Sequence, residues 1–569
     1  MKLSLTLLGL PFLSLAAALP KITRTGKYLY DETGGRFYIK GVAYQPQGEA
    51  AENTEANQAN GGFPEPESFH DPLSSPQNCT RDLPYLKQLG VNSVRVYSVN
   101  SSLNHDECMK TFSDNGIYVL LDVSLPLNGS IDRASPSWST NLLNEYISTI
   151  DTFRNYDNVL AFNIGNEVVN QVSNTNAAPY VKAAARDIKA YLKSVGSSAL
   201  VGYSATDGDA DFRNSLAEYL TCGGDDIAVD LYGLNNYEWC GDANYNSSNW
   251  NTIVSGFQDI PVATYMSEYG CIFQPPRLWT EVAALFSTPV SDVFSGGVAF
   301  SYFPTSDGEL DCYGMVTFSA DGNSVTTSDD FTRLSTQYNA TDPPNSPAQS
   351  SVTAGQTTCP NESASLVASN TLPPTPNQGV CDCINQKALS CLVTSSTANS
   401  PTIVGDLLNY ACTLLGTSTN GTANCDPIGG NGTAGTYGEL SYCSPAVKLS
   451  YAMSAYYEFN PVDSSCDFSG NATLSPTRPN TAQDASSAAS QCLSAEPSGG
   501  TFTPSPVSSS GASQTSRSTS GTNSASASAS ASGGASSGDV RALRILGPGS
   551  ILGGVAILGA ILGGGLMVV

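Results

Sequence analysis

Two glutamates in this chain each follow an apolar run of the kind that forms a β-strand. Glu167 comes after the run at 159–162, and Glu268 comes after the run at 261–265. A carboxyl group at the C-terminal end of a barrel strand faces the mouth where barrel enzymes carry out their chemistry. Two such carboxyls on different strands suit cleavage of a glycosidic bond, since one protonates the leaving oxygen and the other attacks the sugar or activates the attacker. A single glutamate after a strand is more often a solvated loop residue, so the prediction depends on the pair and on Asn166 directly before Glu167.

The elements that would position these glutamates alternate along residues 39–303. Apolar strand-like runs lie at 39–44, 93–99, 117–123, 160–165, 200–204, 227–234, 261–267 and 297–303, and between them lie helix-compatible stretches such as 82–89, 138–153, 178–195 and 278–285. Eight strand–helix units over roughly 300 residues predict the α/β class, with a (β/α)8 TIM barrel as the catalytic domain at 19–340. Glu167 then ends the fourth strand and Glu268 the seventh. A doubly wound open sheet is the alternative, but no Gly-rich phosphate loop follows the first strand.

Both ends of the chain carry signals for processing. Residues 1–18 have a positive start, a short apolar core and a small-residue end, which is typical of a secretory signal peptide. Residues 494–538 are mostly Ser, Ala, Gly and Thr, and they predict an unfolded, O-glycosylated stalk. Small residues near Gly534, followed by an apolar tail within 539–569, predict a GPI-anchor signal that is removed. A single membrane helix is the alternative, and the absence of a basic flank beyond the tail argues against it.

The charge balance excludes some classes of partner. The chain has 25 basic and 50 acidic residues, which give a formal net charge of −25. Nucleic acids and anionic lipids bind basic surfaces, so neither is expected as the main partner, whereas a neutral polysaccharide is indifferent to this charge. The two histidines, His70 and His105, leave little scope for a Ser-His-Asp triad or a His-based zinc site. We expect both to be ordinary surface or loop residues, and we expect no metal and no organic cofactor.

The 15 cysteines suit an extracellular protein, in which disulfides are the default. Eight of them lie within 375–493 and predict a small, disulfide-stapled, mainly helical module, joined to the barrel by a Pro-, Ser- and Thr-rich linker at 341–374. The stretches 404–415 and 445–459 are its helix-compatible parts. Aromatic clusters of this kind are more often core than ligand platform, and this one comprises Tyr451, Tyr456, Tyr457 and Phe459. An odd number of cysteines leaves one thiol over.

Sequons of the form Asn-x-Ser or Asn-x-Thr mark surface positions that accept N-linked glycans in secreted proteins. The secretory signal predicted at 1–18 makes such positions relevant here. The candidates are Asn78, Asn100, Asn128, Asn246, Asn339, Asn361, Asn420, Asn431 and Asn471.

Four segments together resemble the fungal β-1,3-glucanosyltransferases of glycoside hydrolase family 72. They are KGVAYQP at 40–46, VRVY at 94–97, NIGNEV at 163–168 and SEYGC at 267–271. The eight-cysteine segment resembles carbohydrate-binding module family 43, which accompanies one subgroup of those enzymes. The resemblance extends over about residues 19–492 and includes the Ser-rich stalk and the anchor signal.

The resemblance implies a role for each matching residue. Glu167 matches the acid/base and Glu268 the nucleophile of a retaining, two-glutamate mechanism, and Asn166 would bond the 2-hydroxyl of the sugar. Further positions around the cleft, which the resemblance implies to bind substrate, match Gln45, Tyr97, Asp122, Tyr237 and Tyr302. Tyr97 would lie near the nucleophile, and Tyr237 and Tyr302 would be stacking platforms for sugar rings. From the residues alone, a tyrosine at a strand end is more often part of the barrel packing.

The resemblance also implies how the cysteines pair. The barrel and linker would contain Cys79–Cys108, Cys240–Cys271 and Cys222–Cys359, the last of which ties the linker to the barrel. Cys312 would be the free thiol, and a reactive role is not expected because buried thiols are usually inert. The other eight would pair among themselves in a connectivity that stays open: Cys381, Cys383, Cys391, Cys412, Cys425, Cys443, Cys466 and Cys492.

The implied reaction is a transfer. The enzyme would cleave an internal β-1,3-glucan linkage and pass the new reducing end to the non-reducing end of another glucan, which elongates cell-wall glucan. An endo-β-1,3-glucanase shares every motif and differs only in accepting water, and a non-catalytic protein that binds wall glucan is the alternative of another class. The expected partners are donor and acceptor glucan chains and the membrane, through a GPI lipid anchor. We expect a monomer on the outer face of the plasma membrane or in the cell wall.

Overall fold

Eight parallel strands close into a barrel in the part of the chain that the structure, a computed structural model, describes: residues 19–46, 68–126, 129–304 and 313–495. The strands follow the chain around the barrel, and the last pairs with the first. They are β4 (Ile39–Ala43), β5 (Ser93–Val96), β6 (Tyr118–Asp122), β7 (Val159–Asn166), β8 (Leu200–Thr206), β9 (Leu231–Asn235), β10 (Ala263–Tyr269) and β11 (Phe294–Ala299). The predicted TIM barrel is therefore confirmed, with each predicted strand present.

Two shifts in the strand bounds matter for the site. The seventh barrel strand runs on to Tyr269, so Glu268 lies inside β10 rather than just past its end. The second barrel strand ends at Val96, so Tyr97 begins the loop that follows it. Glu167 directly follows the fourth barrel strand, as predicted.

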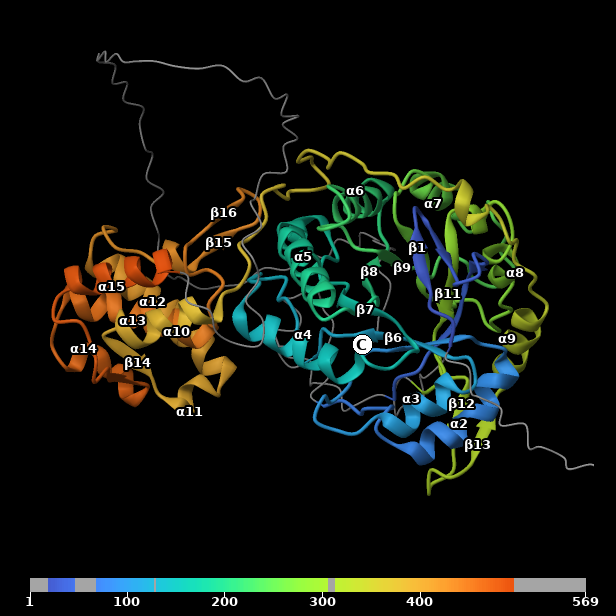
Figure 1. Ribbon diagram of the computed structural model, residues 1–569, viewed down its shortest axis with the longest axis horizontal. Helices are drawn as coiled ribbons and strands as arrows, with labels where there is room; N and C mark the ends of the chain where they lie inside the picture. The colour runs from blue at the N-terminus through green and yellow to red at the C-terminus, as the bar shows by residue number, and fades with distance from the viewer. Residues whose placement is uncertain (1–18, 47–67, 127–128, 305–312, 496–569) are drawn as a thin grey trace, which may run out of the picture. The chain divides into compact units, whose positions relative to one another are not determined.

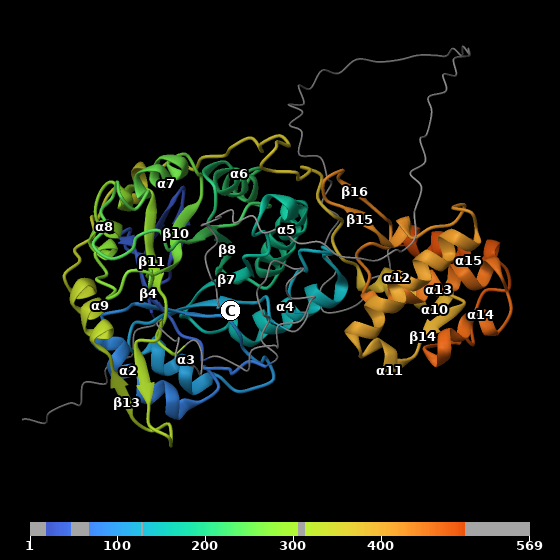
Figure 2. The ribbon, with the colours of Figure 1, turned by 180° about the vertical axis from the view of Figure 1, so that it is seen from behind.

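Helices cover the outside of the barrel (Figures 1 and 2). They are α2 (Pro76–Leu89), α3 (Asp106–Ser113), α4 (Thr140–Phe153), α5 (Ala178–Ser194), α6 (Ala210–Thr221), α7 (Trp250–Phe257), α8 (Glu281–Leu285) and α9 (Asp329–Asn339). Local sequence explains their ends. Proline lies in the first turns of α2 and α5, and Gly90, with φ of 79°, closes α2 in the left-handed region that glycine favours. The predicted helices at 82–89, 138–153, 178–195 and 278–285 correspond to α2, α4, α5 and α8, with shifted bounds.

The alternation of side chains along the strands divides the apolar core of the barrel into two layers. Leu120 and Val298 belong to the cluster inside the barrel. Leu121, Phe162 and Ala299 belong to the cluster between the strands and the helices. Polar side chains that face inward at the C-terminal ends of the strands therefore converge on one site.

Short antiparallel strands accompany the barrel and were not predicted. A three-stranded sheet is formed by β1 (Thr23–Thr25), β2 (Tyr28–Tyr30) and β3 (Arg36–Phe37), and a hairpin is formed by β12 (Val316–Phe318) and β13 (Val325–Thr327). Strands of two or three residues are too short to show an alternating pattern in the sequence. The linker lies against the first sheet, since Tyr30 Oη donates to the carbonyl of Pro347 at 2.9 Å and Tyr38 Oη donates to that of Pro344 at 3.0 Å.

The C-terminal module is mainly helical and has its own core. Its elements are α10 (Gln378–Lys387), β14 (Cys391–Val393), α11 (Ser395–Ala398), α12 (Pro401–Ser418), β15 (Gly430–Asn431), β16 (Thr436–Tyr437), α13 (Pro445–Phe459), α14 (Ser464–Asp467), β17 (Ala472–Leu474) and α15 (Ala482–Ala495). The two predicted helices correspond to α12 and α13. Of the aromatic cluster, Tyr451 and Tyr457 pack against the core, whereas Phe459 is 56% exposed.

Disulfides connect distant parts of the chain. The three pairs expected for the barrel and linker are present: Cys79–Cys108, Cys222–Cys359 and Cys240–Cys271. The module pairs its eight cysteines as Cys381–Cys443, Cys383–Cys492, Cys391–Cys466 and Cys412–Cys425. Cys312 lies outside the described residues.

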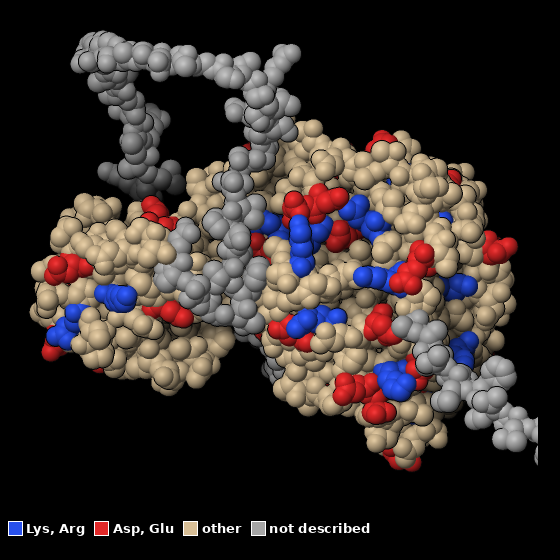
Figure 3. Space-filling view, in the orientation of Figure 1, with Lys and Arg blue, Asp and Glu red and all other residues tan. Residues whose placement is uncertain are grey.

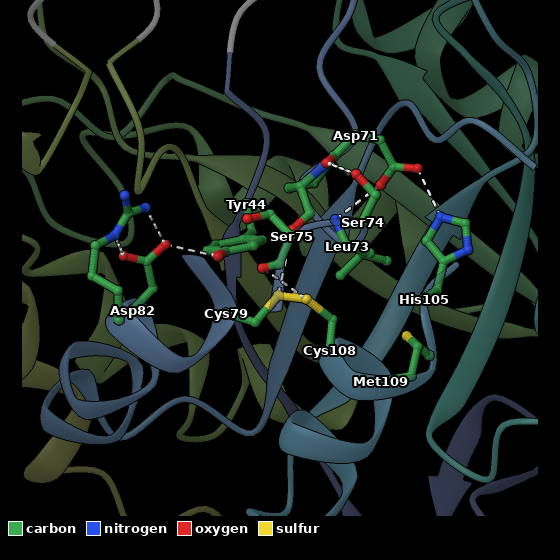
Figure 4. Close-up of a disulfide and its surroundings, with 12 residues drawn as sticks. Tyr44, Asp71, Leu73, Ser74, Ser75, Cys79, Asp82, His105, Cys108 and Met109 are labelled. Atoms are coloured by element: carbon green, nitrogen blue, oxygen red, sulfur yellow. Dashed lines mark hydrogen bonds and ion pairs between the residues drawn. A yellow bond between two sulfur atoms is a disulfide. The ribbon is translucent and has the colours of Figure 1, made fainter. Parts of the chain in front are cut away.

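The expectation that both histidines are surface or loop residues is wrong for His105. This residue is buried, and its Nε2 lies 2.7 Å from Oδ2 of Asp71, as Figure 4 shows beside the Cys79–Cys108 disulfide. The paired carboxylate makes burial of the imidazole tolerable. His70 is exposed, as expected.

Several expectations about the surface and the chain ends can be compared with the described residues. Figure 3 shows acidic and basic side chains side by side in small groups on a mostly uncharged face. Within the described ranges, no helix combines the length and the apolarity needed to cross a membrane. Most sequon asparagines are exposed, while Asn471 is half-buried and accepts a hydrogen bond from Thr397. Asn128, the signal segment 1–18, most of the stalk and the anchor segment with Gly534 lie outside the described residues.

Candidate active site

Glu268 points into the mouth of the barrel and is held by three donors. Tyr97 Oη donates to Oε1 at 2.9 Å, and Tyr237 Oη donates to Oε2 at 2.9 Å. Arg95 Nη1 lies 3.2 Å from Oε1. The side chain is almost fully buried, with 3% exposure of the residue, so these contacts replace the water that a carboxylate would otherwise bind.

Arg95 connects Glu268 with two other polar residues. It lies fully buried in β5, and its Nη2 donates to Asp122 at 2.9 Å and to Oδ1 of Asn166 at 2.9 Å. Its guanidinium also lies 4.2 Å from the ring centroid of Tyr97. We did not predict this residue as part of the site, although a charged residue at the centre of an apolar strand is a signal for it.

Asp122 is buried against Arg95, and not placed to contact a substrate as expected. It is 1% exposed at the end of β6, and its oxygens accept hydrogen bonds from Arg95 and from Nδ2 of Asn163 at 2.7 Å. A carboxylate occupied in this way orients Arg95 rather than a sugar. The expectation of a substrate contact is corrected accordingly.

Glu167 is held in an unusual backbone conformation. Its φ is 51°, in the left-handed region that a residue with a Cβ adopts at a cost, and such conformations persist where the surroundings enforce them. The Glu167 N–H donates to the carbonyl of Ser204 at 2.8 Å, and Arg133 Nη2 donates to the carbonyl of Glu167 at 3.1 Å. The turn directs the carboxyl toward β9, where Nδ2 of Asn235 donates to Oε1 at 2.7 Å.

The surroundings of the two carboxyls separate their proton affinities. Burial, and secondarily the charge of Glu268, raises the pKa of Glu167 from the ordinary 4.5 to about 7. Burial also raises the pKa of Glu268, but Arg95 and the hydroxyls of Tyr237 and Tyr97 oppose that rise. The negative charge of the pair therefore resides on Glu268, and the proton resides on Glu167. This arrangement can supply a nucleophile and an acid at the same time.

Asn235 joins the two glutamates and was not predicted. Its Nδ2 also lies 3.2 Å from Oδ1 of Asn166, and its Oδ1 accepts a 2.7 Å hydrogen bond from Ser267, the residue before Glu268. With its oxygen bonded by Arg95 and Asn235, Asn166 has no acceptor bonded to its Nδ2 among the described residues. That amide group is therefore not engaged by the described residues of the protein.

Gln45 fixes the loop that carries Tyr97. Its Oε1 accepts hydrogen bonds from the N–H groups of Tyr97 at 3.1 Å and Ser98 at 2.9 Å. Its Nε2 donates to the carbonyls of Pro46 at 3.2 Å and His70 at 2.6 Å. All hydrogen-bonding groups of this amide are engaged within the protein. Gln45 therefore positions the wall of the cleft, and the expectation that it contacts the substrate is wrong.

Aromatic rings gather at the mouth beside Glu268. Tyr237 makes edge contacts with Phe300, at 6.4 Å between ring centroids, and with Tyr313, at 5.8 Å. Arg277 Nη1 donates to the carbonyl of Phe300 at 2.6 Å, and its Nη2 donates to that of Tyr313 at 2.7 Å. Of these three rings only Tyr237 was predicted as part of the site. Phe300 directly follows β11, and Tyr313 lies further along the chain, before β12.

The expectation that Tyr302 is a stacking platform is wrong. Its side chain is fully buried, its Oη donates to Asp82 at 3.1 Å, and its ring packs against Tyr44 and Phe303. The Tyr302 N–H donates to the carbonyl of Ala43 at 2.9 Å, which holds the residue against β4 with its side chain toward α2. A tyrosine near a strand end thus belongs to the packing outside the barrel.

Metal-ligating groups do not gather at this site. Among the described residues, no group of three or more His, Cys, Asp or Glu side chains is arranged to hold a metal ion.

Comparison with known proteins identifies the family to which the chain belongs. The glucanosyltransferase family of glycoside hydrolases matches residues 12–342, and the X8 domain matches residues 389–473. The chain belongs to this glucanosyltransferase family. Both halves of the resemblance seen in the sequence are thereby confirmed.

Individual relatives are similar along most of the chain. The 1,3-β-glucanosyltransferase gas1 of Schizosaccharomyces pombe is 41% identical over 477 residues, which cover 83% of this chain and 82% of that protein. The pH-responsive protein 2 of Candida albicans is 40% identical over 495 residues, covering 86% and 84%. A mutant of Gas2 of Saccharomyces cerevisiae, solved with laminaritetraose and laminaripentaose, superposes with a TM-score of 0.71 at 33% identity and covers 83% of this chain and 99% of that one.

Proposed function

We propose that Glu268 is the nucleophile and Glu167 the acid/base of this β-1,3-glucanosyltransferase. The observation that carries the proposal is the contrast between the two carboxyls. Glu268 receives a cation and two hydroxyls, whereas Glu167 receives the neutral amide of Asn235. The cation and the hydroxyls favour a carboxylate at Glu268. At Glu167, burial and the charge of Glu268 outweigh the single amide donor and favour a protonated acid. A retaining mechanism uses these two states.

The first step breaks an internal β-1,3 linkage of the donor glucan. Glu268 attacks the anomeric carbon, and Glu167 gives its proton to the oxygen of the departing glucan end. The donor fragment remains attached to Glu268 as a covalent ester. Because this ester has no charge, the like-charge contribution to the pKa of Glu167 is lost, and that pKa falls.

The second step rebuilds the linkage on an acceptor. Glu167, now a carboxylate, takes the proton of the 3-hydroxyl at the non-reducing end of another glucan, and this oxygen displaces Glu268. The acceptor chain becomes longer, and both glutamates return to their first states. The fall in pKa during the first step suits this change of Glu167 from acid to base.

The neighbouring side chains support these two steps. Arg95, Tyr97 and Tyr237 hold the oxygens of Glu268, and Asn166 offers its amide to the 2-hydroxyl of the reacting sugar. Water and a glucan hydroxyl would use the same two carboxyls, so the choice between hydrolysis and transfer depends on how the acceptor is held. The rings of Tyr237, Phe300 and Tyr313 offer apolar surface of the kind on which sugar rings pack.

The location of the enzyme is proposed from the chain ends. A secretory signal at 1–18, the paired cysteines and the apolar tail at 539–569 support a protein that is secreted and attached by a GPI lipid to the outer face of the plasma membrane, to the wall, or to both. We expect it to act as a monomer. The proposed parts are the catalytic domain at 19–340, the strapped linker at 341–374 and the module at 375–493, which supports the barrel or binds glucan.

Product analysis tests this function. The secreted chain is incubated with a β-1,3-gluco-oligosaccharide of one length, and the products are measured by mass. Products longer than the substrate are expected, and E268Q, which should fold normally, is expected to yield none. Only shorter products would favour the endo-β-1,3-glucanase. An unchanged substrate in the presence of folded wild-type protein would favour a glucan-binding protein without activity.

A further inference from the structure

A second concave site lies between helix α2 and the β12–β13 hairpin, which are neighbours in Figures 1 and 2. It is a groove of about 950 Å³, and none of the residues described above for the active site lines it. Helix α2 contributes Gln77, Asn78 and Thr80 to one wall, and the turn of the hairpin contributes Asn323 and Ser324 to the other. The lining thus combines these amide and hydroxyl groups with the apolar faces of Pro84 and Tyr85.

Contacts within the protein hold the two walls in place. Arg81 Nη1 donates to the carbonyl of Gly322 at 2.5 Å, and Tyr85 Oη donates to that of Val325 at 3.2 Å. The Arg81 guanidinium also lies 4.3 Å from the ring centroid of Phe318 in β12. The Cys79–Cys108 disulfide fastens the same end of α2 to α3 (Figure 4). The groove is therefore a preformed feature of the fold.

One wall of the groove carries a glycosylation sequon, Asn78-Cys79-Thr80. Cys79 is fully buried, while Asn78 and Thr80 on either side of it are exposed. No hydrogen bond engages the Asn78 amide within the described residues. A group attached to its Nδ2 would start at the wall of the groove.

We propose that Asn78 carries an N-linked glycan whose first sugars lie in this groove. The bond forms between Nδ2 of Asn78 and the anomeric carbon of an oligosaccharide donated from a lipid diphosphate, and the lipid diphosphate and an amide proton leave. The proposal requires the secretion proposed above, because this modification belongs to secreted chains.

The chemistry of the lining fits such an occupant. Amide and hydroxyl groups of Gln77, Asn323 and Ser324 can exchange hydrogen bonds with sugar hydroxyls and acetamido groups. Pro84 and Tyr85 offer apolar faces to the C–H groups of a sugar ring. Covalent attachment also gives the sugar an effective concentration in the millimolar range at this site, so weak contacts are enough to seat it.

A seated glycan would brace the hairpin against α2. The hairpin begins directly after Met315. Ser301, two residues after the end of β11, donates its N–H to the carbonyl of Tyr313 and accepts the N–H of Met315. The glycan would thus support the segment that brings Tyr313 to the mouth of the barrel.

Resistance to deglycosylation tests the proposal. The full chain from a secreting eukaryotic host is treated in its native state with a peptide-N-glycan amidase, and release at Asn78 is compared by peptide mass with release at exposed sequons such as Asn361. Release at Asn78 is expected to be at least about tenfold slower, as for a glycan seated ten times as often as it is free. Unfolding and reduction should abolish the difference. The double variant Q77A/N323A, which trims one residue on each wall, should speed native release at Asn78 alone.

Other outcomes would overturn the proposal. Equal native release at Asn78 and Asn361, or resistance unchanged in Q77A/N323A, would show that the groove does not hold the glycan. A bare Asn78 in a chain glycosylated elsewhere would refute this site but leave secretion intact. A chain that has no glycan at any sequon and stays inside the cells would refute both.

Discussion

Arg95 Nη1 lies 3.2 Å from Oε1 of Glu268, and Nη2 of the same guanidinium lies 2.9 Å from Oδ2 of Asp122. One fully buried cation is thus shared between a carboxylate that anchors it and a carboxylate that reacts. Burial raises the pKa of Glu268, and the cation opposes this rise. The arrangement keeps a nucleophile charged inside an apolar barrel.

Replacing Arg95 by lysine tests this role. The variant R95K keeps a positive charge but loses the planar fork that reaches both carboxylates. The pKa of Glu268 should rise, so the acidic limb of the pH profile of kcat/KM should move to higher pH, and kcat should fall by about 10²-fold. An acidic limb that stays in place would contradict the role of Arg95.

The proton on Glu167 predicts how activity and stability depend on pH. Because the first step requires protonated Glu167, activity should fall as pH rises through about 7. The pKa of Glu167 is higher in the folded than in the unfolded state, so its protonation stabilises the fold. This stabilisation is complete below about pH 4.5 and is lost as pH rises through about 7. The free energy of unfolding should fall by about 3 kcal/mol at most over this range. E167Q should be inactive and lack this loss. Denaturant unfolding of both proteins at pH 4.5 and 8 measures the difference, and parallel pH dependence would contradict the assignment.

Asn235 should act through Glu167 rather than on the substrate. Its hydrogen bond lowers the pKa of Glu167, so N235A should raise that pKa and move the basic limb of the activity profile upward. The carboxyl also loses its orientation, and kcat should fall by about tenfold to a hundredfold with little change in KM. S267A removes only the hydrogen bond that Ser267 donates to the oxygen of Asn235. It should therefore shift the basic limb and lower kcat less than N235A does. A rise in KM with an unmoved basic limb would instead indicate a substrate contact.

Tyr237 and Tyr302 should respond differently to the loss of a hydroxyl. Y237F removes a donor to Glu268, so kcat should fall by about tenfold or more and the acidic limb should move upward. Y302F removes a donor to the buried Asp82, which still has hydrogen bonds from Arg81 and Tyr44. This variant should lose about 1 kcal/mol of stability, with unchanged kinetics. Thermal unfolding and steady-state kinetics of the two variants separate these effects. A kinetic defect in Y302F would restore it as a residue of the cleft.

The barrel and the two glutamates could be predicted because their signals are local. Each long strand has a run of apolar residues, and Glu167 and Glu268 directly follow or end such runs. The strand bounds were less predictable, since β10 continues through Glu268 to Tyr269 by pairing with its neighbours. The two- and three-residue strands depend on tertiary contacts and leave no pattern.

The hydrogen-bond network of the site could not be predicted in the same way. Arg95 lies 173 positions from Glu268 in the sequence, and Asn235 lies 68 positions from Glu167. These pairs come into contact only because the barrel closes, so nothing in the local sequence indicates them. Tyr302 was misplaced because its position depends on a bond to Ala43 in the first barrel strand. The four disulfides of the module likewise follow from how its helices pack.

Trapping the covalent intermediate tests the central claim most directly. A β-1,3-linked gluco-oligosaccharide with fluorine at C2 and a good leaving group at C1 is incubated with the wild-type chain. The fluorine slows both steps, and the good leaving group restores the rate of the first step only, so the covalent intermediate accumulates. Mass spectrometry of the digested protein should find the sugar ester on the peptide that contains Glu268, and E268Q should remain unlabelled. A label on Glu167, or normal turnover in E268Q, would contradict the account.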